Sequence, residues 1–172
     1  MLYYVRKAKA SDLDDILKVI QNGRETLENN NIPQWRNNEG PNEAVLKKDI
    51  HLGEGYVLIE TDRIVGFGTI TTGIQDGYAD ITEGQWIDTD EYVSIHRFVI
   101  LSSIKQRGMS QFFLGHLISF SKMLGYIDLR VDTHPLNYGM QRVIDKSGFS
   151  YQGNIILDCA DGERKAYQLI LS

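Results

Sequence analysis

YVSIHRFVIL, at 92–101, decides the fold together with SSIKQRG at 102–108 and MSQFFLGHLISFSKML at 109–124. The first segment is dense in β-branched and aromatic residues, which predicts a strand. In the third segment, large apolar side chains recur at helical spacing, which predicts a long amphipathic helix between Gly108 and Gly125. Its apolar stripe consists of Phe112, Phe113, Leu117, Phe120 and Leu124.

The rest of the chain adds strands and helices on both sides of this unit. Upstream, the patterns predict strands at 2–6, 56–60 and 63–71, a helix that begins after Ser11 and loses its pattern from Asn22, and a helix from the cap Asn42 through Ile50. Downstream, they predict strands at 127–133, 151–157 and 166–171 and a short helix ending at Lys146. The polar segment 73–90 indicates a surface excursion or a short hairpin. One domain of mixed α+β class, spanning 1–172, accounts for this order.

The composition is that of an ordinary globular protein. Of 172 residues, 42% are apolar and 24% are charged, which argues against disorder. The net charge of −5 argues against a nucleic-acid partner, which would require a basic face. No apolar run approaches the ~18 residues of a membrane span, and the first residues lack the apolar core of a signal peptide. We therefore expect a cytoplasmic protein without a membrane partner.

Metal and disulfide chemistry have no support in the sequence. Cys159 is the single cysteine, so it has no partner for an internal disulfide. We expect it to be a small buried residue in a late strand. The four histidines lack the spacing of metal ligands, so we expect no metal cofactor.

The turn before Gly108 has the features of an anion site. A helix N-terminus offers unpaired backbone N–H groups, and a glycine lets the backbone approach a bound group. Lys105 and Arg107 add positive charge, so phosphate is the natural ligand. Many strand–helix turns contain a glycine and a basic residue, so a purely structural turn is the alternative.

Several familiar active-site motifs are absent from the sequence. There is no G-x-x-x-x-G-K-[ST] loop, no G-x-G-x-x-G after the first strand, no G-x-S-x-G elbow and no H-E-x-x-H pair. A P-loop enzyme, a Rossmann dinucleotide enzyme, an α/β-hydrolase and a zinc peptidase are therefore unsupported.

Two motifs resemble those of the GNAT N-acetyltransferase superfamily. KQRGMS at 105–110 is similar to the [Q/R]-x-x-G-x-[G/A] motif of that family, and Asn137 is followed eleven residues on by Gly148-Phe149, as in its later motif. The resemblance extends from Leu2 to about Leu171. It implies a mostly antiparallel central sheet with helices on both faces and a splay between the strands at 92–101 and 127–133.

A bacterial subgroup of this family is similar in more detail. It carries I-H-R in the central strand, a D-T-H-x-x-N-x-x-M-Q run and a P-Q-W-like segment. Here these are Ile95-His96-Arg97, DTHPLNYGMQ at 132–141 and Pro33-Gln34-Trp35. The family also implies a homodimer.

The resemblance implies acetyl-CoA as co-substrate and an amine as acceptor, acetylated by direct attack in a ternary complex. Backbone groups of Phe98, Val99 and Ile100 would pair with the pantetheine arm, and the Val99 N–H would receive the oxyanion. The Asn137 side chain would form a hydrogen bond near the pantetheine or near the reacting thioester. The pyrophosphate would be wrapped by Lys105, Gln106, Arg107, Gly108, Met109 and Ser110.

Three positions depart from the family pattern. Lys105 replaces Gln or Arg, and Ser110 replaces Gly or Ala; both are tolerable, because backbone N–H groups do the wrapping. Ile144 stands where many members place a Tyr that protonates the leaving thiolate. Another group or a water molecule must then protonate the thiolate, or the thiolate leaves without a proton. The second route is chemically reasonable, because a thiol of pKa ~8.5 is a fair leaving group at neutral pH.

His96 is the first candidate for the general base, because its usual pKa suits neutral pH. The alternative is a histidine satisfied by a neighbour in a half-buried strand. Glu91 is the second candidate, with a solvated acid at a strand end as its alternative. Because residues alternate along a strand, His96 and Arg97 are expected on opposite faces.

Trp35, Asp132 and His134 are the candidates for acceptor binding. Asp132 and His134 follow the strand at 127–133 and would face the cleft, although His134 precedes Pro135 and could simply shape the turn. Trp35, with Tyr78 and Trp86, falls in segments that would flank the acceptor, with core packing as the alternative.

Two further functions stay open from the sequence. A catalytically idle acyl-CoA-binding module would explain Ile144, and a fold-level mimic would bind another phosphate ligand. The acceptor stays undefined among small amines, polyamines, amino acids, antibiotics and protein amines.

Overall fold

The computed structural model describes residues 1–87, 89–104 and 108–172, and its centre is a seven-stranded sheet in the order β1-β2-β3-β4-β5-β7-β6. The strands are β1 (Tyr3–Lys7), β2 (Gly55–Glu60), β3 (Arg63–Thr72), β4 (Tyr92–Ile100), β5 (Asp128–Thr133), β6 (Ser150–Ile156) and β7 (Glu163–Ile170). The helices are α1 (Leu13–Asn29), α2 (Glu43–His51), α3 (Met109–Met123) and α4 (Tyr138–Lys146), with 3-10 turns η1 (Ala10–Asp12) and η2 (Tyr78–Asp80). The predicted order of elements is confirmed.

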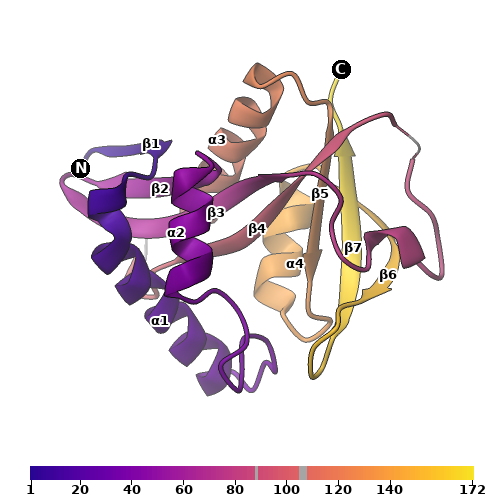
Figure 1. Ribbon diagram of the computed structural model, residues 1–172, viewed down its shortest axis with the longest axis horizontal. Helices are drawn as coiled ribbons and strands as arrows, with labels where there is room; N and C mark the ends of the chain where they lie inside the picture. The colour runs from indigo at the N-terminus through magenta and orange to yellow at the C-terminus, as the bar shows by residue number, and fades with distance from the viewer. Residues whose placement is uncertain (88, 105–107) are drawn as a thin grey trace.

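Five strand pairs are antiparallel, and only β4 and β5 run parallel. This parallel pair is short, because it joins only Tyr92–Ser94 to Asp128–Arg130. Beyond these residues the two strands separate, and Figure 1 shows the sheet opening between them. The mixed α+β class and the splay expected from the resemblance are therefore confirmed.

Helices cover both faces of the sheet, with α1 and α2 in front and α3 and α4 behind in Figure 1. The front core contains Ile16 and Ile20 of α1, Leu46 of α2 and Phe67 of β3. The rear core joins both helices behind the sheet: it contains Tyr56, Leu58, Ile95, Phe113, Leu117 and Ile144, among others. Burial of these apolar side chains on both faces stabilises the sheet.

Local sequence signals explain the helix ends in part. Asn42 caps α2 as predicted, because its Oδ1 accepts a 3.0 Å bond from the Val45 N–H. The predicted end of the first helix was wrong: α1 runs on to Asn29. Its second half is fixed by packing, because Gly23 is buried against Val99 of β4.

One other expectation is corrected. Cys159 lies in the turn between β6 and β7 and is half-buried, so it is not part of a strand. Of the two forms expected for the segment 73–90, the structure has the surface excursion: its described residues are mostly exposed and form the turn η2 and a bridge from Thr82 to Asn154, with no hairpin of their own. In the described part of the chain, no helix has both the length and the apolar character needed to cross a bilayer.

Candidate functional site

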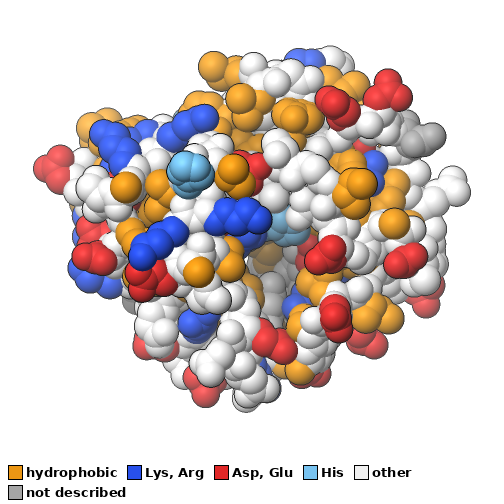
Figure 2. Space-filling model, viewed as in Figure 1, with side chains coloured by type: hydrophobic (Ala, Val, Ile, Leu, Met, Phe, Trp, Pro, Cys, Tyr) orange, Lys and Arg blue, Asp and Glu red, His pale blue; other side chains and the backbone are white. Residues whose placement is uncertain are grey.

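A cavity of about 570 Å³ lies where β4 and β5 separate. Residues 95–100 of β4 form its floor, α1 and the segment 34–41 form one wall, and β5, α4 and the β6–β7 turn form the other. Figure 2 shows this face hollowed near its centre, with acidic side chains to the right of the hollow and basic ones to its left. Charged residues of both signs line it: Glu39, Arg97, Asp132 and Arg164.

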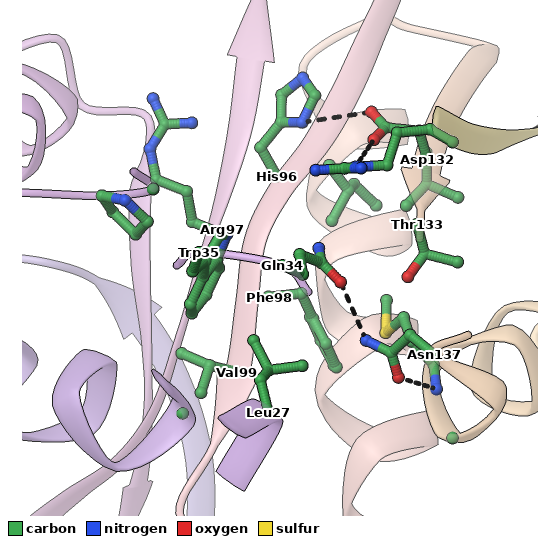
Figure 3. A pocket seen from close by; sticks show the side chains of 18 of the residues that line it. Leu27, Gln34, Trp35, His96, Arg97, Phe98, Val99, Asp132, Thr133 and Asn137 are labelled. Carbon is green, nitrogen blue, oxygen red and sulfur yellow. Dashed lines mark hydrogen bonds and ion pairs between the residues drawn. The ribbon is translucent and has the colours of Figure 1, made fainter. Parts of the chain in front are cut away.

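Two hydrogen bonds tie the segment 34–41 to the opposite wall. The Nδ2 of Asn137 donates to Oε1 of Gln34 at 3.2 Å, and the Ala160 N–H donates to Oε1 of Glu39 at 3.1 Å. Trp35, next to Gln34 in the sequence, also lines the cavity (Figure 3). The cavity is therefore closed on one side by segments far apart in the sequence.

Beyond Ser94, the edge of β4 that faces the cavity pairs with no other strand in the described part of the chain. Ile100 lies opposite Gly66, and the Leu101 N–H donates to the Val65 carbonyl at 2.8 Å, so the N–H of every second residue points to β3. Val99 therefore turns its N–H toward β3, which corrects the expected oxyanion donor. Phe98 and Ile100 turn theirs toward the opening.

A β-bulge interrupts β4 at Arg97, whose φ is +52°. Val99 pairs with Phe67 and His96 with Thr69, so one extra residue of β4 is inserted between the two pairs. Ile95 and Phe98 consequently pack toward the same rear core. The bulge breaks the alternation from which opposite faces were expected for His96 and Arg97, and both residues line the cavity.

Arg97 is held by a buried carboxylate of α2. Its Nε lies 2.9 Å from Oδ2 of Asp49, and its Nη2 donates to Oδ1 at 3.1 Å. Burial raises the pKa of Asp49 to about 6, although Arg97 acts in the opposite direction. The ion pair fixes Arg97 and partly neutralises it on the wall of the cavity.

His96 lies at the opening between β4 and β5 (Figure 3). Its Nδ1 is 3.8 Å from Oδ2 of Asp132, and its Nε2 is 3.0 Å from Oε1 of Gln75. Burial lowers the pKa of His96 below 6.5, and the nearby Asp132 only partly compensates. The ring is therefore neutral at pH 7, as a general base must be.

Asp132, at the end of β5, is held by groups from two other elements. Tyr78 donates its hydroxyl proton to Oδ2 at 2.7 Å, and Arg164 Nε lies 3.8 Å from Oδ1. Burial, followed by the Asp132 charge, raises the pKa of Tyr78 well above 10, so Tyr78 stays a donor. These contacts aim the carboxylate at His96.

The N-terminus of α3 opens on the same cavity. Gly108 is the N-cap of α3, with a φ of +84°. The first intrahelical bond runs from the Phe112 N–H to the Gly108 carbonyl. The N–H groups of residues 109–111 are thus free of helical partners, and Ser110 lines the cavity. Lys105, Gln106 and Arg107 lie outside the described residues.

No protein-family model matches this chain. The crystal structure of a GNAT-family acetyltransferase from Streptococcus agalactiae 2603 is 32% identical, with a TM-score of 0.89, and the match covers 99% of this chain and 96% of that one. This chain belongs to the GNAT family of acetyltransferases.

Two more distant proteins agree with the GNAT assignment. An aminoglycoside N(6')-acetyltransferase type 1 from Salmonella typhimurium is 24% identical over 112 residues, which are 63% of this chain and 77% of that protein. The structure of yncA from Salmonella typhimurium with its cofactor acetyl-CoA shares the fold, with a TM-score of 0.69 at 16% identity over 99% of this chain and 95% of that one.

The residues that the resemblance singled out at α4 lie in different surroundings. Asn137 lines it and also caps α4, because its Oδ1 accepts from the Met140 N–H at 3.1 Å. Ile144, in the place of the family's Tyr, is fully buried in the rear core. Thr133 lines the cavity, and its buried hydroxyl has no partner among the described residues.

Two sequence candidates lie away from this GNAT site. Glu91 is exposed just before β4 and is not among the described residues that line the cavity. His134 is buried, and its Nδ1 accepts a 3.1 Å bond from the Leu136 N–H, so it shapes the turn before α4. Burial, followed by the charge of Arg164, lowers the pKa of His134.

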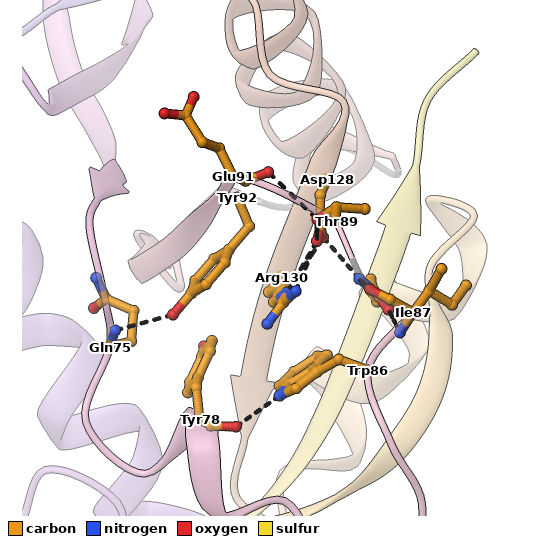
Figure 4. A network of polar contacts seen from close by, with 10 residues as sticks. Gln75, Tyr78, Trp86, Ile87, Thr89, Glu91, Tyr92, Asp128 and Arg130 are labelled. Carbon is orange, nitrogen blue, oxygen red and sulfur yellow. Dashed lines mark hydrogen bonds and ion pairs between the residues drawn. The ribbon is translucent and has the colours of Figure 1, made fainter.

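Tyr78 and Trp86 pack in a separate core beneath the segment 73–91 (Figure 4). Their rings stack with their centroids 5.3 Å apart. The guanidinium carbon of Arg130 lies 4.5 Å from the ring centroid of Trp86 and 3.9 Å from that of Tyr92. Arg130 also donates to Asp128 Oδ2 at 2.8 Å. This network anchors the segment that delivers Tyr78 to Asp132.

Sequence reasoning missed several residues of the site, notably Gln75, Gln34 and Arg164. Gln75 and Gln34 lie in irregular segments, and Arg164 is the second residue of β7, so periodicity carries no signal for them. For Gln34, the signal was its place inside the quoted segment Pro33-Gln34-Trp35.

Proposed function

We propose that this GNAT acetyltransferase moves the acetyl group of acetyl-CoA to a primary amine held in the cavity, by direct attack in a ternary complex. The observation that carries the proposal is the opening between β4 and β5, with His96 and Asp132 on its two sides. A cytoplasmic location and a homodimer stay predictions from the sequence.

The residues around the opening fit acetyl-CoA. Unpaired backbone groups of Phe98 and Ile100 suit the amides of the pantetheine arm, as an added strand pairs with a sheet edge. The free N–H groups at the start of α3 suit the pyrophosphate. Asn137 also lines the cavity, and its Nδ2 donates a hydrogen bond to Gln34 in this structure.

His96 takes the proton of the acceptor amine in this proposal. A neutral primary amine has two N–H groups, and Nδ1 of His96 and Oδ2 of Asp132 are two acceptors 3.8 Å apart. The amine donates one N–H to each while its lone pair attacks the thioester carbon. Asp132 then stabilises the imidazolium that forms. A secondary amine has only one N–H and is expected to react more slowly.

The remaining steps need little from side chains. The Phe98 N–H, on the open edge of β4, is the donor for the oxyanion. As the new C–N bond forms, the C–S bond breaks, and the thiolate leaves. Because Ile144 is an apolar core residue, the leaving thiolate receives no proton from that position, which a thiol of pKa ~8.5 tolerates.

The acceptor class is proposed from the curated relative and the cavity. An aminoglycoside carries several amines, and the relative that is 24% identical to this chain is named for that substrate. Acidic side chains at the cavity, Glu39 and Asp132, suit a cationic acceptor. Aminoglycosides are therefore the first amines to be tested as acceptors, followed by polyamines, amino acids and peptides with free N-termini.

The test begins with binding, measured by calorimetry with CoA and acetyl-CoA. Ser110→Asp places a negative charge beside the free N–H groups of α3, which weakens CoA binding about 10-fold or more. Ser119→Asp adds the same charge to an exposed position on α3 and is the matched control. Unchanged affinity in Ser110→Asp would place CoA elsewhere.

Thiol release from acetyl-CoA over the amine panel then tests turnover. Release that requires a primary amine supports the proposal. CoA binding with no turnover on any amine would favour the alternative of an idle acyl-CoA-binding module, which Ile144 keeps open.

A further inference from the structure

Gln75 lies between β3 and η2, and its side chain is fixed by backbone groups. Its Nε2 donates to the carbonyl of Gly73 at 3.0 Å and to that of Thr72 at 3.4 Å. Its own N–H donates to the Tyr92 hydroxyl at 3.0 Å (Figure 4). Both ends of Gln75 are therefore held in place.

These contacts decide which way the amide of Gln75 points. The NH₂ group can donate to two carbonyl oxygens, whereas the amide oxygen in that place would face them without a proton between. The amide oxygen is therefore the atom that faces His96, 3.0 Å from its Nε2. Because an amide oxygen only accepts, Nε2 of His96 must carry a proton.

The proton on Nε2 fixes the tautomer of His96. A neutral imidazole has a single N–H, so the lone pair is on Nδ1. Nδ1 is the nitrogen beside the opening, 3.8 Å from Oδ2 of Asp132. In the other tautomer, an Nδ1–H would point at Asp132, and the lone pair would point at Gln75, away from the acceptor.

We propose that Gln75 is a positioning residue for acetyl transfer, which holds His96 in the tautomer whose lone pair faces the acceptor amine. The inference rests on the proposed function for its kinetic consequence. The tautomer itself is a property of the resting protein and is measured without turnover.

Charged and titratable groups from several elements also act on His96. Asp132 of β5 and Glu54, which precedes β2, favour its protonation, whereas its neighbour Arg97 opposes it. The Tyr78 ring lies 6.1 Å from the imidazole. All of them stay in place when Gln75 is replaced, so a change in the His96 tautomer reports the loss of the amide.

The first experiment is ¹⁵N NMR of histidine-labelled protein above pH 7, with the His96 signals assigned by their loss in His96→Gln. The wild type is expected to show a protonated Nε2 and an unprotonated Nδ1. Gln75→Leu removes the acceptor, so the signals are expected to move toward a protonated Nδ1. Gln75→Glu loses the two bonds to the Thr72 and Gly73 carbonyls but keeps an acceptor oxygen for Nε2 of His96, so the signals are expected to stay closer to those of the wild type than in Gln75→Leu. A protonated Nδ1 in the wild type, or unchanged signals in Gln75→Leu, overturns the proposal.

The second experiment is steady-state kinetics at saturating acetyl-CoA. Gln75→Leu is expected to lower kcat about 10-fold or more, short of the ~10²–10⁴-fold that general-base catalysis contributes. The KM for acetyl-CoA is expected to stay unchanged. Gln75→Glu restores part of kcat, because it keeps the acceptor for Nε2 but not the bonds to the Thr72 and Gly73 carbonyls, and its added negative charge moves the acidic limb of the pH profile to higher pH. An unchanged kcat in Gln75→Leu contradicts the role.

Gln21→Leu is the matched control, because Gln21 is exposed on α1, where its amide donates to Glu25. It should change neither the spectrum nor the rate. If no amine is acetylated by the wild type, the proposed function fails, while the resting spectrum still decides whether Gln75 sets the tautomer.

Discussion

The Tyr78 hydroxyl donates a 2.7 Å hydrogen bond to Oδ2 of Asp132, and the same oxygen lies 3.8 Å from Nδ1 of His96. One carboxylate thus joins the segment 73–91 to the candidate base. Since Tyr78 is fully buried, this carboxylate cannot move without disturbing a core.

Asp132→Asn tests what the charge does to His96. The Asp132 carboxylate raises the pKa of His96, in opposition to burial, so its removal lowers that pKa further. We expect the acidic limb of the pH–rate profile to move to lower pH. The rate on the plateau should fall about 10-fold, because a weaker base takes the proton. A limb that stays in place or moves to higher pH would contradict this arrangement.

Asp49 gives a prediction for folding stability. Its pKa is about 6 in the folded protein, against 3.8 for the free group, so the folded state binds the proton more tightly. Its contribution to stability is therefore present below pH ~4 and is lost as the pH rises to about 6. The loss is about 3 kcal/mol at ~1.4 kcal/mol per unit. Urea unfolding across this window should show a steeper loss in the wild type than in Asp49→Asn. Parallel curves would refute the buried-carboxylate assignment.

Two substitutions of Arg97 test the bulge in β4. Its φ of +52° is unfavourable for any residue with a Cβ, by ~1–2 kcal/mol. Arg97→Gly and Arg97→Ala both leave Asp49 without its partner, so their difference isolates the backbone. We expect the glycine variant to be more stable by about 1 kcal/mol in urea unfolding. If β4 were a regular strand at this position, the alanine variant would be the more stable of the two, and that result would contradict the bulge.

Gly23 tests the contact between α1 and the floor of the cavity. A Cβ at this position would lie 2.6 Å from Cγ2 of Val99, so Gly23→Ala should destabilise the fold by about 1–3 kcal/mol despite its better helix propensity. Gly115→Ala in α3 is the control. Its Cβ would meet no described atom within 4 Å, so the free energy of unfolding should rise by about 0.5–1 kcal/mol. Equal effects of the two substitutions would refute the close approach.

The order of the elements and the family could be predicted from the sequence, because periodicity, caps and short motifs are local signals. The site required the structure, because its geometry depends on pairing between distant segments. The bulge at Arg97 exists only against β3, so alternation along β4 misplaced its side chain. The direction of the Val99 N–H follows from the same register. Gln75 reaches His96 only after the segment 73–91 has packed on β5, and no pattern in that segment indicates the contact.

The most direct test of the account is the pH dependence of thiol release at saturating acetyl-CoA with a primary amine, in the wild type and in His96→Gln. The account predicts a wild-type rate that falls as the pH drops through the lowered pKa of His96, below 6.5. It predicts that His96→Gln loses ~10²–10⁴-fold on the plateau and no longer shows that limb. A variant with the wild-type rate and the same profile would contradict the assignment of His96 as the base at the opening between β4 and β5.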